Sequence, residues 1–95
     1  MKDQIKDTKA KIIEILKKHN IKKASLFGSI VRGELTESSD IDILIEFEGR
    51  KSLIDLVGLK LELEEIIGRK IDLLTYNSLH PLLKDKILET QEIII

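Results

Sequence analysis

The sequence has no cysteine and no tryptophan, and its 95 residues include one proline, one tyrosine and two phenylalanines. The absence of cysteine excludes disulfides, thiolate metal sites and cysteine nucleophiles. An excess of charge of either sign is also missing, because 16 basic and 17 acidic residues give a net charge of −1. Proteins that bind nucleic acid by neutralising phosphates normally have a basic excess, so we expect no direct nucleic-acid binding.

Long apolar runs are absent as well. Residues 1–20, "MKDQIKDTKAKIIEILKKHN", mix acids and lysines among the apolar residues. They contain neither the apolar core of a signal peptide nor the ~20 apolar residues of a membrane span. We therefore expect a cytoplasmic protein that does not enter a membrane. The composition of 42% hydrophobic and 35% charged residues is typical of a folded chain. Its length predicts a single domain over residues 1–95.

Periodic apolar residues predict four helices. Residues 4–19 place apolar side chains at steps of three and four, and Asn20 can end that helix. A short helix follows Gly28, with Ser29 as its expected cap and Gly33 as its limit. A third helix begins at Ser52, whose spacing from Asp55 is that of a capping box, and ends at Gly68. A fourth has Pro81 in its first turn.

The strands are predicted between these helices. Residues 22–27 read as a short strand, residues 34–39 as a polar loop, and residues 40–47, "DIDILIEF", as an alternating strand with one buried face. Residues 70–76 alternate again, and the closing "EIII" predicts a short edge strand. The order indicates an α/β or α+β domain in which helices pack on one face of a small mixed sheet.

Three aspartates stand in the two best strand patterns, although aspartate is disfavoured in strands. Asp40, Asp42 and Asp72 each lie on the face opposite the isoleucines. Residues i and i+2 of a strand project from one face, and a neighbouring strand stands about 5 Å away, so the three carboxylates can converge. Carboxylates held close repel one another, and the hard cations Mg²⁺ or Mn²⁺ would compensate them. Two such ions can clamp the oxygens of a phosphoryl displacement.

The stretch "GSIVRG" supplies groups of the kind that hold phosphate. Gly28 lets the backbone approach a ligand, and Ser29 begins a helix whose free N–H groups point outward. Arg32 follows one turn later and could pair with a phosphate oxygen. A surface ion pair is the equally weighted alternative for Arg32.

"GSIVRG" followed by "SDIDIL" is similar to the Gly-Ser…Asp-x-Asp signature of the DNA polymerase β-like nucleotidyltransferase superfamily, and the size resembles its minimal nucleotidyltransferase (MNT) branch. Ten residues separate Ser29 from Asp40, and "KIDLLT" supplies the third aspartate, Asp72. The resemblance covers residues 22–76, and the tail also looks like the family's closing helix and strand.

The resemblance implies the polymerase β-like fold and the transfer of a nucleoside monophosphate from an NTP to a hydroxyl acceptor. Asp40, Asp42 and Asp72 would be the catalytic and metal-binding residues, and Asp72 would assist deprotonation of the acceptor. Gly28, Ser29 and Arg32 would bind the nucleotide, which we expect to be ATP. Members of this branch are often encoded with a small helical HEPN toxin and act as its antitoxin, in some cases by adenylylating it.

Several alternatives stay open. A calcium loop would continue after Asp-x-Asp with further ligands, whereas this sequence continues as an apolar strand. The three aspartates could be solvated surface carboxylates. The protein could also be a binding module that neutralises a helical toxin by occlusion alone, or a purely structural dimerisation domain. Sequence does not decide which NTP is used, which residue is modified, or whether the chain forms a homo-oligomer.

Overall fold

The computed structural model describes residues 2–36 and 38–95, so Glu37 of the predicted polar loop lies outside the described residues. The elements, in chain order, are α1 (Lys2–Lys18), β1 (Ile21–Phe27), α2 (Ser29–Arg32), β2 (Ile41–Phe47), α3 (Leu53–Ile67), β3 (Ile71–Thr75), the 3₁₀ turn η1 (Tyr76–Ser78), α4 (Pro81–Thr90) and β4 (Glu92–Ile93). This is the predicted order, with the final residues forming the expected edge strand.

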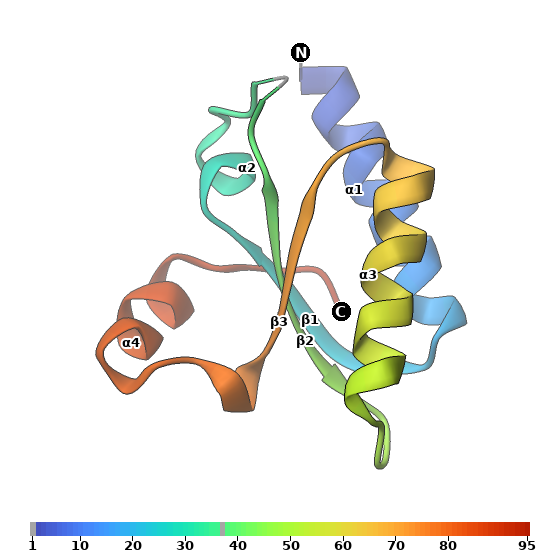
Figure 1. The fold of residues 1–95 in the computed structure, drawn as a ribbon. Helices are drawn as coiled ribbons and strands as arrows, with labels where there is room; N and C mark the ends of the chain where they lie inside the picture. The colour runs from blue at the N-terminus through green and yellow to red at the C-terminus, as the bar shows by residue number, and fades with distance from the viewer. Residues whose placement is uncertain (1, 37) are drawn as a thin grey trace.

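The four strands form one mixed sheet in the order β3-β2-β1-β4. β1 pairs antiparallel with β2 and with β4, whereas β2 and β3 are parallel. A parallel pair needs a crossover connection, and α3 provides it between β2 and β3. Figure 1 shows α1 and α3 on one side of the sheet, with α4 standing off the other side.

The core lies between the sheet and the pair α1 and α3. Ile12 and Leu16 of α1, and Leu59 and Leu63 of α3, are buried there. The inward residues of β2 complete this core, with Ile41, Ile43 and Ile45 fully buried. The periods of α1 and of the strands place the core where the sequence predicted it. In α3 the apolar pattern was a poorer guide, because Leu53, Val57 and Ile66 are exposed whereas Leu59 is buried.

The sequence predicted that only one face of β2 is buried, but part of the other face is buried too. Leu44 lies on the same face as Asp42, yet it is fully buried. Ser25 and Leu74 are its neighbours on the adjoining strands, and η1 contacts β2. The turn after β3 therefore closes the middle of this face, which the alternation within β2 alone could not reveal.

The helix ends follow the capping predictions with one exception. Ser52 and Asp55 form the reciprocal capping box, and Gly68 ends α3 in the left-handed conformation. At α2 the cap is Gly28, and Ser29 is instead the first helical residue. The prediction of Ser29 as the cap was wrong because Gly28 has φ 76° and ψ −146°, a conformation that glycine adopts readily and that lets the chain turn one residue earlier.

No helix in the described part of the chain combines the length and the apolar character that crossing a membrane requires.

Candidate active site

Two carboxylates face each other across the parallel strands. Asp42 of β2 is directly opposite Asp72 of β3 in the register. Both side chains leave the sheet on the face away from α1 and α3, because their neighbours Ile41, Ile43 and Ile71 fill the core. The strand alternation and the crossover through α3 together produce this pair.

The pair carries an electrostatic cost. Burial is the largest cause that raises the pKa of Asp42 from 3.8 to about 6, followed by the negative charges of Asp72 and Asp40. A hydrogen bond that protonated Asp42 can donate to Asp72 adds to the rise. Arg32 acts in the opposite direction and lowers the pKa of Asp42. Burial and the neighbouring carboxylate therefore make the ionised form of Asp42 less favourable than that of a free aspartate, and a bound cation would compensate this cost.

Gly28 lies directly against Asp42, one member of this pair. It follows Phe27, which is paired with Asp42 across β1 and β2. A Cβ placed on Gly28 would collide with Oδ2 of Asp42, far inside van der Waals contact. Its φ of +76° is also one that other residues rarely adopt. Both constraints require glycine, so the backbone after β1 forms one wall beside the Asp42 carboxylate.

The turn that begins at Gly28 leads into α2. The carbonyl of Gly28 accepts the first bonds of α2, from the N–H groups of Val31 at 3.1 Å and Arg32 at 3.3 Å. The N–H groups of Ser29 and Ile30 precede those bonds and are not used by the helix. Because α2 has only four residues, its helix dipole is small. Any binding by these N–H groups would therefore rest on the individual hydrogen bonds that they donate.

Arg32 is exposed and pairs with Glu34, with Nε 3.0 Å from Oε2. This is the ion-pair arrangement that the sequence left open. Its charge still reaches Asp42, whose pKa it lowers. An exposed ion pair of this kind contributes little stability, so Arg32 can exchange Glu34 for another anion at small cost.

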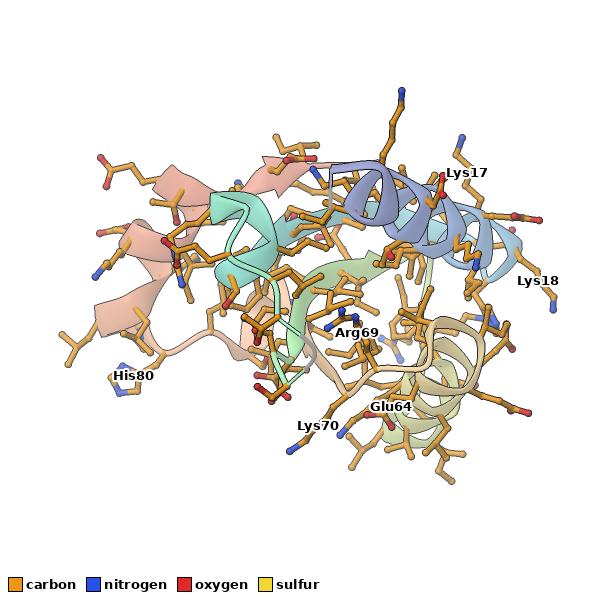
Figure 2. All side chains as sticks on the ribbon, turned by 90° about the horizontal axis from the view of Figure 1, so that it is seen from above. Lys17, Lys18, Glu64, Arg69, Lys70 and His80 are labelled. Atoms are coloured by element: carbon orange, nitrogen blue, oxygen red, sulfur yellow. The ribbon has the colours of Figure 1, made fainter. Side chains whose placement is uncertain are left out.

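Asp40 precedes β2 and is exposed, so it acts on Asp42 through its charge. The loop before it is braced: the N–H of Thr36 donates to Ser39 Oγ at 3.0 Å, and the N–H of Ser39 donates to the carbonyl of Thr36 at 3.1 Å. Arg69, labelled in Figure 2, donates from its guanidinium to the same carbonyl. The sequence pattern did not identify Arg69 as a brace of this loop. Its position just before the strand that carries Asp72 could have indicated that it lies near the site.

The carboxylate oxygens of Asp42 and Asp72 are of the kind that bind a hard divalent cation. Asp42 and Asp72 offer oxygen ligands, and their mutual repulsion is what a cation would relieve. Among residues 2–36 and 38–95, however, no three Asp, Glu or His side chains stand close enough together to hold a metal. The structure therefore brings two of the three predicted ligands, Asp42 and Asp72, together. The third, Asp40, is exposed and lies just before β2.

The two histidines serve the scaffold. His19 Nε2 lies 3.1 Å from Glu62 Oε1 and links α1 to α3, while His80 accepts the N–H of Leu82 and caps α4. Figure 2 shows His80 at the end of the molecule away from Lys17 and Lys18. Neither histidine belongs to the carboxylate pair.

The carboxylate pair, the glycine turn and the mixed sheet can be compared with known proteins. The family profile described as "Polymerase beta, Nucleotidyltransferase" matches residues 10–95. The chain belongs to this family. This nucleotidyltransferase is 63% identical over 84 residues to the Methanocaldococcus jannaschii protein named "Putative protein adenylyltransferase MJ0435", covering 88% of this chain and 90% of that one. It is 39% identical over 66 residues to "Protein adenylyltransferase MntA" of Thermococcus cleftensis, covering 70% of this chain and 67% of that one.

Solved structures share the fold of this nucleotidyltransferase. The structure titled "Structure of putative minimal nucleotidyltransferase" superposes with a TM-score of 0.80 at 31% identity, over 98% of this chain and 93% of the other. A second, titled "Crystal structure of the toxin-antitoxin with AMP-PNP", has a TM-score of 0.78 at 24% identity, over 90% of this chain and 70% of the other. The polymerase β-like fold and the minimal branch that the signature implied are thereby confirmed.

Proposed function

We propose that this nucleotidyltransferase moves AMP from ATP to a hydroxyl group on a helical HEPN-type toxin and so neutralises it. The observation that carries the proposal is the Asp42 and Asp72 pair, with the glycine turn after β1 directly against Asp42. Relatives named protein adenylyltransferases support AMP as the transferred group. A neighbouring structure titled as a tri-AMPylated Shewanella oneidensis HEPN toxin with its MNT antitoxin supports the partner.

Each residue has a distinct role in this reaction. The backbone N–H groups of Ser29 and Ile30 bind phosphate oxygens, and Gly28 lets the phosphates approach closely. Arg32 releases Glu34 and pairs with a phosphate. Asp42 and Asp72 would hold Mg²⁺, with Asp40 completing the ligand set from the approach; Mn²⁺ suits the same oxygens. When bound, two such ions would supply the positive charge that compensates the phosphates.

The transfer step is a displacement at the α-phosphorus. The acceptor oxygen forms a bond to that phosphorus, and the bond from phosphorus to the oxygen bridging to the β-phosphate breaks. Pyrophosphate leaves with that oxygen. The acceptor hydroxyl proton passes to the carboxylate of Asp72, which is exposed and therefore open to an incoming protein. The half-buried Asp42 takes no part in this proton transfer and faces the nucleotide.

Label position and matched variants test this proposal. The protein is incubated with a HEPN-type partner and ATP labelled at either the α- or the γ-phosphate. The proposal expects α-label on the partner, and a loss of at least ~100-fold in rate for Asp42→Asn and Asp72→Asn, equivalent to about 2.7 kcal/mol. Glu46→Gln is the control, because Glu46 lies on the same strand and face as Asp42 and its only ion pair in the described chain is with Lys22.

Two outcomes would contradict the proposal. Transfer of γ-label would indicate a kinase. If Asp42→Asn and Asp72→Asn neutralised the toxin as well as the wild type while no label was transferred, the protein would act by occlusion as a binding module.

A further inference from the structure

Two consecutive residues anchor the chain on either side of Asp40. The guanidinium of Arg69 donates to the backbone carbonyl of Thr36, which lies before Asp40. The backbone carbonyl of Lys70 accepts the N–H of Ile41, which follows Asp40 directly, at 3.0 Å. The segment of residues 36–41 is therefore held at both of its ends by the chain just before β3.

The turn between these anchors ends next to Asp40. The N–H of Ser39 donates to the Thr36 carbonyl at 3.1 Å, and the N–H of Thr36 donates to Ser39 Oγ at 3.0 Å. The same carbonyl thus accepts from both Ser39 and Arg69, which its two lone pairs allow. Arg69 holds the group on which this turn closes, so its contact fixes the chain directly before Asp40.

Glu64 fixes the segment that carries both anchors. Its Oε2 accepts the N–H of Ile71 at 3.0 Å, and its backbone carbonyl accepts the N–H of Gly68 at 2.9 Å. Ile71 is fully buried and directly precedes Asp72. Arg69 lies between Gly68 and Ile71, so it extends from a segment that is tied to the end of α3 on both sides.

An ion pair does not explain the position of Arg69. Among the side chains that the structure describes, no ion pair includes Arg69, although it is half-buried. The adjacent Lys70 is exposed, and Figure 2 shows its side chain pointing away from the body of the molecule. The two neighbouring cations therefore differ in use: the side chain of Arg69 holds the loop, whereas Lys70 contributes its backbone. This difference makes the Lys70 side chain a matched control.

We propose that Arg69 is a positioning residue, which holds the chain around Asp40 so that the Asp40 carboxylate can join the Asp42 and Asp72 pair on a divalent cation. The role of the three carboxylates rests on the proposed function. Without the Arg69 contact the loop is released at Thr36, and binding of the cation must then restrict it again. The entropy lost in that restriction weakens the binding.

Binding of Mn²⁺ alone tests this role without ATP or a partner. The signal of free Mn²⁺ in electron paramagnetic resonance gives the Kd for the full chain. Arg69→Met removes every donor, keeps an apolar stem and should raise this Kd at least about 10-fold, because the loop is no longer pre-ordered. Arg69→Lys retains a donor and should stay within about 3-fold of the wild type. Lys70→Met should leave the Kd unchanged.

A double-mutant cycle separates positioning from a general structural role. Asp40→Asn should itself weaken Mn²⁺ binding. If Arg69 acts through Asp40, adding Arg69→Met to Asp40→Asn should change the Kd less than about 2-fold. Circular dichroism and Tm check that each variant is folded, and Arg69→Gln takes the place of Arg69→Met in the cycle if the latter does not fold.

Three results would overturn the role of Arg69. They are a wild type that takes up no Mn²⁺ over the millimolar range, an Arg69→Met protein with the wild-type Kd, and a Kd raised by the same factor with and without the Asp40 carboxylate. Labelling of a HEPN-type partner together with such independent effects would support the transfer reaction and exclude the positioning role. The expected cycle without labelling of the partner would support the positioning role and contradict the transfer reaction.

Discussion

Replacing Asp42 by asparagine should make the metal-free protein more stable at neutral pH. In the folded chain the pKa of Asp42 is raised from 3.8 to about 6, mainly by burial and then by Asp72. A shift of about two units corresponds to about 3 kcal/mol at ~1.4 kcal/mol per unit. Because the side chain is only half buried, solvent screening reduces this to about 1–2 kcal/mol. The ionised carboxylate therefore opposes folding, and asparagine removes that opposition.

The effect has a defined pH window. Between about pH 3.8 and 6 the folded state holds the Asp42 proton more tightly than the unfolded chain does. Stability from this group is therefore highest below about pH 3.8, falls as the pH rises, and is fully lost above about 6. The advantage of Asp42→Asn should accordingly be present at pH 7.5 and shrink towards pH 4. Groups far from Asp42 contribute alike in both proteins, so the difference between them reports Asp42 and its interactions with Asp72 and Asp40.

Thermal unfolding in EDTA measures this difference. For a domain of this length each kcal/mol moves Tm by roughly 4 to 8 °C, so Asp42→Asn should melt about 4 to 16 °C higher at pH 7.5. Addition of Mg²⁺ should raise the Tm of the wild type and leave that of Asp42→Asn nearly unchanged. Glu46→Gln should stay within about 0.5 kcal/mol of the wild type. A less stable Asp42→Asn protein in EDTA, or one that keeps the full response to Mg²⁺, would refute the reasoning.

Three further substitutions address the turn, the second sheet face and a cap. Gly28→Ala should abolish ATP binding in calorimetry and cost about 1–3 kcal/mol in urea unfolding, because its φ is left-handed and its Cβ would strike Asp42. Tyr76→Phe should cost about 1–3 kcal/mol in urea unfolding, because the Tyr76 hydroxyl is 2.9 Å from the fully buried Ser25 Oγ. Ser52→Ala should lower the unfolding free energy by about 1 kcal/mol through loss of the capping box. Unchanged urea midpoints would contradict the last two.

The sequence was sufficient to predict the elements and the faces of the strands. Alternation placed Asp42 and Asp72 opposite the isoleucines, and that is where they lie. It could not give their register, because pairing across parallel strands depends on the length and packing of α3. Nor could it show that Asp40 stays outside β2, since "DIDILIEF" alternates through Asp40 without a break.

The rest of the site depended on contacts between distant segments. The Ser25 hydroxyl needs Tyr76, which is 51 positions away, and no local pattern links the two. The burial of Leu44 likewise follows from η1 packing against β2. The cap at Gly28 depends on one backbone angle, whereas serine is the statistically preferred capping residue. Sequence periodicity therefore finds elements and faces, and tertiary packing decides which groups on a face meet.

The most direct test of the central claim is the transfer of label from ATP carrying the α-phosphate label to a HEPN-type partner. The wild type and Glu46→Gln should label the partner and release pyrophosphate, and Asp42→Asn and Asp72→Asn should be slower by at least ~100-fold. Labelling by the two asparagine variants at close to the wild-type rate would show that the Asp42 and Asp72 pair is not the site of nucleotidyl transfer.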